Sequence, residues 1–141
     1  MHTRDLDQAV EAVTRMFCPH TLTVMGRNRN RGINMRLDVV DPSSQPTVEL
    51  AYGAPVRIDS RVGRFLVLHC ARGAAATVRE GQMAEWRQGQ TMPFSAGVET
   101  QFLLDRWCLQ RCTLLDTEKL ETLCARWLGR PLERPLRFAP R

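Results

Sequence analysis

The chain has 141 residues, 43% of them hydrophobic and 25% charged, which is typical of a single soluble globular domain. Its net charge of +5 comes from 20 basic and 15 acidic residues; all the basic residues but Lys119 are arginines, and only Arg27, Arg29 and Arg31 cluster, as in a solvated loop. No apolar run approaches the roughly 20 residues of a membrane span, and early acidic residues exclude a signal peptide, so we expect a cytoplasmic protein with no membrane partner.

A helix is predicted over Asp5–Cys18, with Asp5 as its N-cap. Ala9, Val13 and Phe17 recur at the helical period, and Pro19 ends the pattern. After this helix the period changes to two. Alternating apolar and polar residues predict strands at Leu22–Met25, Ile33–Val40, Val48–Tyr52 and Val56–Val62.

The stretch Val62–Gln101 organises the chain. Glycines occur at positions 73, 81, 89 and 97, once every eight residues, with strand-like alternation between them. Glycine takes the positive φ angles that tight turns need, so this spacing predicts short antiparallel strands. The run Phe65–Cys70 is apolar on both faces and is expected to be a central strand covered on both sides, whereas Pro93 is expected at a strand end or edge.

Two further strands, Gln101–Leu104 and Trp107–Leu115, are predicted before a second helix. Asp116 or Thr117 should cap this helix, and Gly129 followed by Pro131 should end it. The tail Arg130–Arg141 shows no regular pattern. The whole chain is therefore predicted to be mainly β, an antiparallel sandwich or barrel with one helix at each end.

No catalytic motif is present. His2, His20 and His69 lie too far apart in sequence to indicate a metal site, and neither a P-loop nor a G-x-S-x-G or G-x-G-x-x-G motif occurs. The five cysteines include no C-x-x-C pair, and we expect all of them to be reduced. The sequence thus predicts no catalytic residue, no metal and no cofactor.

The remaining candidate site is the barrel interior. We expect a small organic molecule, an aromatic carboxylate among the candidates, to bind near His69 and Trp86, with Arg36 as the cationic partner and Tyr52 and Gln101 as orienting groups. Each residue also has a structural interpretation: His69 and Trp86 as core or edge residues, and Arg36 as a solvent-exposed side chain. The pattern alone leaves both open.

The second helix carries an apolar stripe that includes Leu120, Leu123 and Trp127. Such a stripe packs on the domain's own core or on a second copy of the chain. We expect a homodimer that uses these three residues.

Several segments together carry a resemblance to a known family. They are Ala12–His20, Val48–Gly53, Val56–Ile58, Phe65–Gly73 and the closing Leu128–Leu132 with Pro135–Phe138. With these segments in this order, the chain resembles the N-terminal regulatory domain of AraC-type transcriptional activators, the subgroup with an AraC-binding-like cupin domain.

The resemblance implies a cupin-like antiparallel barrel or jelly roll spanning residues 1–141, which binds a small-molecule effector and dimerises. A helix-turn-helix domain normally follows in such regulators, so DNA contact is expected only through that domain, which is absent from this chain. Two alternatives remain: a cupin-class enzyme, although the H-x-H pair of a metal cupin is missing, and a stand-alone small-molecule-binding protein.

Overall fold

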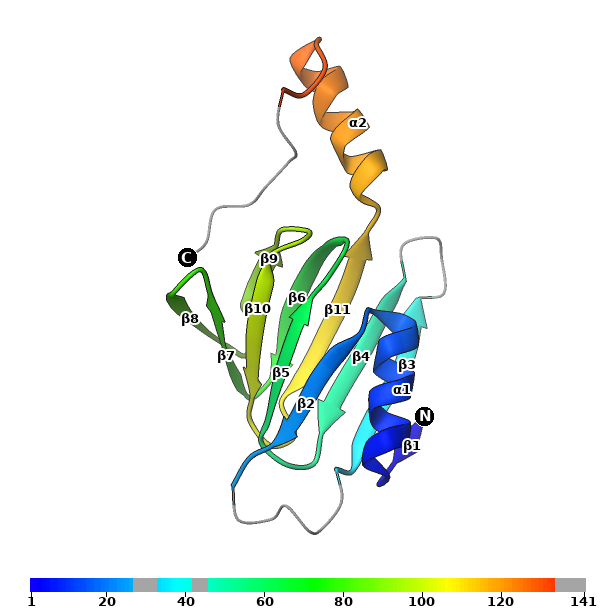
Figure 1. Ribbon diagram of the computed structural model, residues 1–141, viewed down its shortest axis with the longest axis vertical. Coiled ribbons are helices and arrows are strands. Elements are labelled where there is room, and N and C mark those ends of the chain that lie inside the picture. Colours follow the sequence, from blue (N-terminus) through cyan, green and yellow to red (C-terminus); the bar gives the residue numbers. More distant parts are fainter. Residues whose placement is uncertain (27–32, 42–45, 134–141) are drawn as a thin grey trace.

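A computed structural model describes residues 1–26, 33–41 and 46–133 of the chain. Within these ranges two antiparallel sheets face each other, and a helix lies at each end of the chain, which confirms the predicted fold class (Figure 1). The helices are α1 Leu6–Met16 and α2 Thr117–Leu128. The strands are β1 His2–Thr3, β2 His20–Val24, β3 Met35–Asp41, β4 Thr47–Tyr52, β5 Val56–Arg61, β6 Phe65–Arg72, β7 Ala74–Arg79, β8 Gln82–Arg87, β9 Thr91–Phe94, β10 Glu99–Leu104 and β11 Leu109–Leu115.

The two sheets have the orders β1-β3-β4-β11-β6-β9 and β2-β5-β10-β7-β8. The strands β1 and β2 are therefore edge strands of different sheets, on the same side of the barrel. Helix α1 connects these two strands in sequence and packs against both of them, so it closes the seam between the sheets on that side (Figure 1).

Helix α1 begins where the sequence predicts. The Asp5 carboxylate accepts a hydrogen bond from the backbone N–H of Gln8 at 2.9 Å, which satisfies one of the free donors of the first turn. The helix ends at Met16, slightly before the predicted end at Cys18. Its buried residues Ala9 and Val13 face the core between the sheets.

The predicted glycine turns are confirmed: Gly73, Gly81, Gly89 and Gly97 all have positive φ angles, between 74° and 89°. Gly73 carries a second constraint, because a Cβ atom there would lie 3.1 Å from the Cα of Cys108. At Gly81, by contrast, a Cβ atom would meet open space.

The expectation that β6 is covered on both faces is wrong. Leu66, Leu68 and Cys70 are buried toward the core, whereas Val67 and His69 are only half-buried on the outer face. The reason is that β6 lies between β11 and β9 in a sheet whose outer face no described helix covers. Pro93 lies in β9, at the edge of this sheet, as predicted.

Helix α2 is capped at both ends as predicted, by the Asp116 side chain and by Gly129 in the left-handed conformation. It follows β11 directly and projects away from the sheets (Figure 1). None of its residues is buried, and Trp127 is 85% exposed.

Among the described residues, no helix is both long and apolar enough to cross a membrane. The arginines at 27, 29 and 31 and the tail from residue 134 lie outside the described residues.

The two glycine environments predict different costs for a methyl group. Gly81→Ala should lower the free energy of unfolding by about 1 kcal/mol, because only the left-handed backbone opposes it. Gly73→Ala should lower it by at least about 1 kcal/mol more, because the Cys108 backbone must also shift. Urea unfolding of both variants measures the difference; equal losses would contradict this assignment.

Candidate functional site

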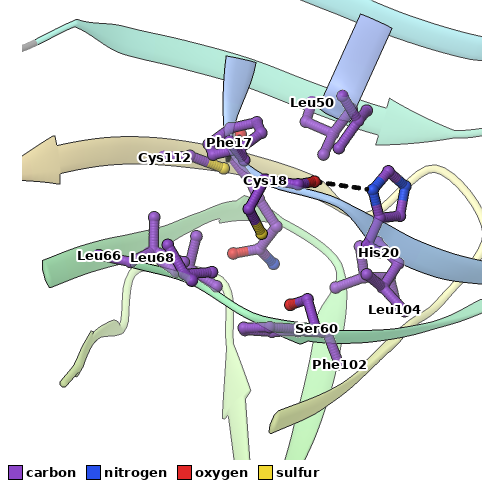
Figure 2. Close-up of a pocket in the computed structure, with 14 residues that line it drawn as sticks. Phe17, Cys18, His20, Leu50, Ser60, Leu66, Leu68, Phe102, Leu104 and Cys112 are labelled. Carbon is purple, nitrogen blue, oxygen red and sulfur yellow. Dashed lines mark hydrogen bonds between the residues drawn. The ribbon is translucent and has the colours of Figure 1, made fainter. Parts of the chain in front are cut away.

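A small cavity of about 60 Å³ lies inside the barrel, between the two sheets and under the end of α1 (Figure 2). Its walls come from α1 and the segment after it, from β2, β5 and β10 of one sheet, and from β4, β6 and β11 of the other. The residues that line it are Val13, Phe17, Cys18, His20, Leu50, Ile58, Ser60, Val62, Leu66, Leu68, Phe102, Leu104, Gln110 and Cys112.

The lining is apolar and carries no Arg, Lys, Asp or Glu side chain. Two of its thiols also remain neutral. Burial raises the pKa of Cys18, an effect partly offset by a hydrogen bond with Ser60, and burial followed by the nearby Cys108 raises the pKa of Cys112 to about 12. The cavity therefore offers dispersion contacts and a few neutral polar groups to a ligand.

His20 is the histidine that lines the cavity. Its Nδ1 lies 3.2 Å from the carbonyl oxygen of Cys18 (Figure 2). The same nitrogen lies 3.4 Å from Thr14 Oγ1. Burial lowers the pKa of His20, and the hydrogen bond to the Cys18 carbonyl opposes this shift only in part. Its Nε2 is buried and has no hydrogen-bond partner among the described residues.

Gln110 joins the cavity to a buried polar chain deeper in the barrel. The Trp86 indole N–H donates to Gln110 Oε1 at 3.1 Å, and Gln110 Nε2 donates to the Cys108 sulfur at 2.9 Å. The Cys108 and Cys70 sulfurs lie 4.0 Å apart, and both cysteines are free thiols. These contacts hold the Gln110 side chain in one orientation beside the cavity.

Of the five predicted ligand residues, Trp86 and Tyr52 lie in the interior. Tyr52 is fully buried, its hydroxyl has no hydrogen-bond partner among the described residues, and burial together with the nearby Cys112 raises its pKa. Trp86 lines an open groove of about 440 Å³ between the edge strands β8 and β9. Neither residue lines the cavity between the sheets.

The other three predicted residues lie on the outer faces of the sheets, which differs from the expected position inside the barrel. Arg36 is exposed, with its guanidinium 5.3 Å from the centre of the Trp107 ring, and Gln101 is exposed on β10. His69 contacts Thr91 Oγ1 through Nδ1 at 2.8 Å. Strand alternation explains all three positions, since their neighbours along each strand point inward. The binding role of the five residues stays a prediction.

Sequence reasoning missed the cavity residues because nothing marks them locally. Phe17 and His20 lie around the end of α1, and their side chains meet residues of β6 and β11 only in the folded barrel. The available signal was the inward parity of the apolar residues in strands such as β5 and β10. Among the described residues, no group of three or more His, Cys, Asp or Glu side chains could hold a metal ion.

The AraC-binding-like domain family matches residues 9–141 of the chain. Among solved structures, the AraC-like transcriptional activator CuxR superposes with a TM-score of 0.70 at 14% identity, covering 92% of this chain and 51% of CuxR. The chain therefore spans about half the length of CuxR. Curated protein sequences gave no significant match.

Two more distant structures share the fold. A cupin superfamily protein from Desulfitobacterium hafniense has a TM-score of 0.53 at 11% identity, covering 68% of this chain and 99% of that protein. An HTH_3 family transcriptional regulator from Vibrio cholerae has a TM-score of 0.51 at 14% identity, covering 64% of this chain and 55% of that regulator. These likenesses confirm the cupin-like fold.

The hydrogen bond between Trp86 and Gln110 beside the cavity can be tested by a double-mutant cycle. Gln110→Leu should lower the free energy of unfolding by about 1–3 kcal/mol, because it leaves the buried Trp86 N–H without an acceptor. Combining it with Trp86→Phe, which removes that donor, should give a loss about 1 kcal/mol smaller than the sum of the two single losses. Denaturant unfolding of the three variants measures this coupling, and strictly additive losses would show that the hydrogen bond contributes nothing.

Proposed function

The chain belongs to the AraC-binding-like domain family, and on this premise we propose that it is the effector-sensing and dimerisation domain of an AraC-type transcriptional regulator. In this role it binds a small organic molecule inside the barrel and pairs with a second copy of itself. DNA is then read by a helix-turn-helix domain elsewhere in a longer protein.

The observation that carries the proposal is the apolar cavity between the sheets. Pockets for organic ligands are concave and mostly apolar, with a few placed polar groups, and His20, Ser60 and Gln110 supply such groups here. The cavity of about 60 Å³ is smaller than the 150 Å³ or so that admits benzene, so a ring-sized ligand must widen it. Its wall from α1, a helix at the seam of the barrel, is the part able to move without breaking a sheet.

The same geometry gives little support to the enzyme alternative. The Cys18 thiol has a raised pKa, and His20 contacts the Cys18 carbonyl oxygen rather than its sulfur, so no activated nucleophile is formed. A stoichiometric transition metal in the purified protein would nevertheless support a cupin-class enzyme. A stand-alone small-molecule-binding protein would have the same kind of cavity as a regulator. A DNA-binding domain encoded in the same gene would identify the regulator.

Dimerisation is proposed through α2. Leu123 and Trp127 are 49% and 85% exposed, and Leu120 lies on the same side of the helix. Exposed apolar side chains in a row are typical of an interaction surface. A twofold contact would bury the stripe of each copy against that of the other.

Effector binding can be tested with a thermal-shift screen of aromatic acids, sugars and uncharged apolar compounds. We expect at least one compound to stabilise the protein. Val62→Phe places a larger side chain in the cavity and should lower the affinity for that compound by at least about tenfold, as measured by calorimetry.

The controls for this experiment are His69→Ala and Arg36→Ala, which alter the outer-face residues predicted from the sequence. Both should leave the affinity unchanged. If these variants lose binding while the folded Val62→Phe variant keeps it, the ligand binds outside the cavity. If no compound binds the wild-type protein, the effector-sensing proposal fails.

The dimer proposal predicts that Leu120→Glu, Leu123→Glu and Trp127→Glu each weaken self-association by at least about tenfold, because each places a charge in an apolar contact. Light scattering over a concentration series measures the mass. Ala125→Glu is the matched control, because the helical period places Ala125 on the opposite side of α2. Folded variants that all remain dimeric would assign the contact to another surface.

A further inference from the structure

The charge of the cavity lining restricts the ligand. Because none of the lining residues is acidic or basic apart from His20, a carboxylate or an ammonium group bound there would lack a counter-charge. Moving an unpaired ion from water into an apolar site is strongly unfavourable. His20 does not change this, because its burial favours the neutral ring.

The contacts of His20 define its tautomer. The Cys18 carbonyl oxygen, 3.2 Å from Nδ1, can only accept a hydrogen bond, whereas the Thr14 hydroxyl at 3.4 Å can donate or accept. Both contacts are satisfied together only when Nδ1 carries the proton, so the geometry favours that tautomer. In the neutral ring Nε2 then carries a lone pair and no proton, and it can only accept. His20 thus supplies an acceptor at the edge of the cavity.

This acceptor is unused within the described part of the chain. Five buried side-chain nitrogen or oxygen atoms there have no hydrogen-bond partner, and among them only His20 Nε2 belongs to a residue that lines the cavity. Among the other polar side chains of the lining, Gln110 is engaged with Trp86 and Cys108, and Ser60 lies beside the Cys18 thiol. Buried polar atoms without a partner are uncommon and destabilising, so a ligand that supplies a donor here gains affinity.

We propose that the ligand is a small, uncharged, mainly apolar molecule with one hydroxyl group, and that His20 Nε2 accepts the hydrogen bond of that hydroxyl. This inference rests on the proposed effector-sensing function and narrows it. It disfavours the aromatic carboxylate expected from the sequence, because neither a cation nor an N–H donor of His20 is available to a carboxylate in the cavity. His20 is thereby the specificity-determining residue of the site.

The test uses three probes that share a cyclopentyl ring: methylcyclopentane and cyclopentanol, which are close in size, and the larger, charged cyclopentanecarboxylate. All three carry the same ring, which must widen the small cavity in each case, so differences in affinity report the substituent. With the wild-type chain, cyclopentanol should bind about three- to tenfold more tightly than methylcyclopentane, the gain expected of one hydrogen bond. Cyclopentanecarboxylate should bind at least about tenfold more weakly than cyclopentanol.

His20→Phe should remove the preference for cyclopentanol over methylcyclopentane, and Ser60→Ala, a hydroxyl variant in the same lining, should keep it. A measurement on the wild-type chain covers the case in which His20→Phe does not fold. The ¹⁵N signal of His20 Nε2 should shift on addition of cyclopentanol and stay in place with methylcyclopentane. His2→Gln and His69→Gln assign this signal, because both residues lie away from the cavity.

Two results would overturn the inference. One is tighter binding of the carboxylate than of the alcohol, and the other is an alcohol preference that survives His20→Phe with an unmoved Nε2 signal. Either result leaves the proposed sensing function intact, because a ligand still binds. Failure of every compound in the wider screen instead contradicts the sensing function itself.

Discussion

Closure of the seam between β1 and β2 by helix α1 is the constraint on which this structure depends. Two facing sheets leave open sides wherever their edge strands do not pair, and apolar side chains there would meet water. Helix α1 fills this side with Ala9 and Val13, both buried, and its Asp5 cap fixes where the helix begins. The helix thereby also supplies one wall of the cavity, so the element that completes the core defines the site as well.

Inside the barrel, polar atoms are tolerated because they bond to one another. Trp86, Gln110 and Cys108 form a chain in which each donor has an acceptor, and Gln110 is only 1% exposed. Burial raises the pKa of Cys108, an effect that the hydrogen bond from Gln110 partly offsets and the nearby Cys70 reinforces, so its thiol stays protonated. A protonated thiol is a poor nucleophile, so Cys108 is not activated for attack on an electrophile.

The fold could be predicted from local signals, whereas the site could not. Glycine turns and period-two alternation depend on neighbours in sequence, and Asp5, Asp116 and Gly129 act on their own helices. The buried face of β6 cannot be predicted in this way, because Phe65–Cys70 is apolar on both sides. Only the opposing sheet determines which side is buried. His69 was consequently assigned to the interior. The cavity wall that includes His20 exists only through contacts between distant segments.

Strand β11 continues into α2 through a single residue, Asp116, whose side chain caps the helix. Cys112 lies at the cavity wall, and Trp127 lies near the far end of the helix. Three strand residues and most of a twelve-residue helix separate them by roughly 25 Å. A rotation of about 5° at the cavity end would therefore displace Trp127 by about 2 Å, from the same lengths. No described residue of α2 is fully buried, so little packing on the barrel opposes this movement.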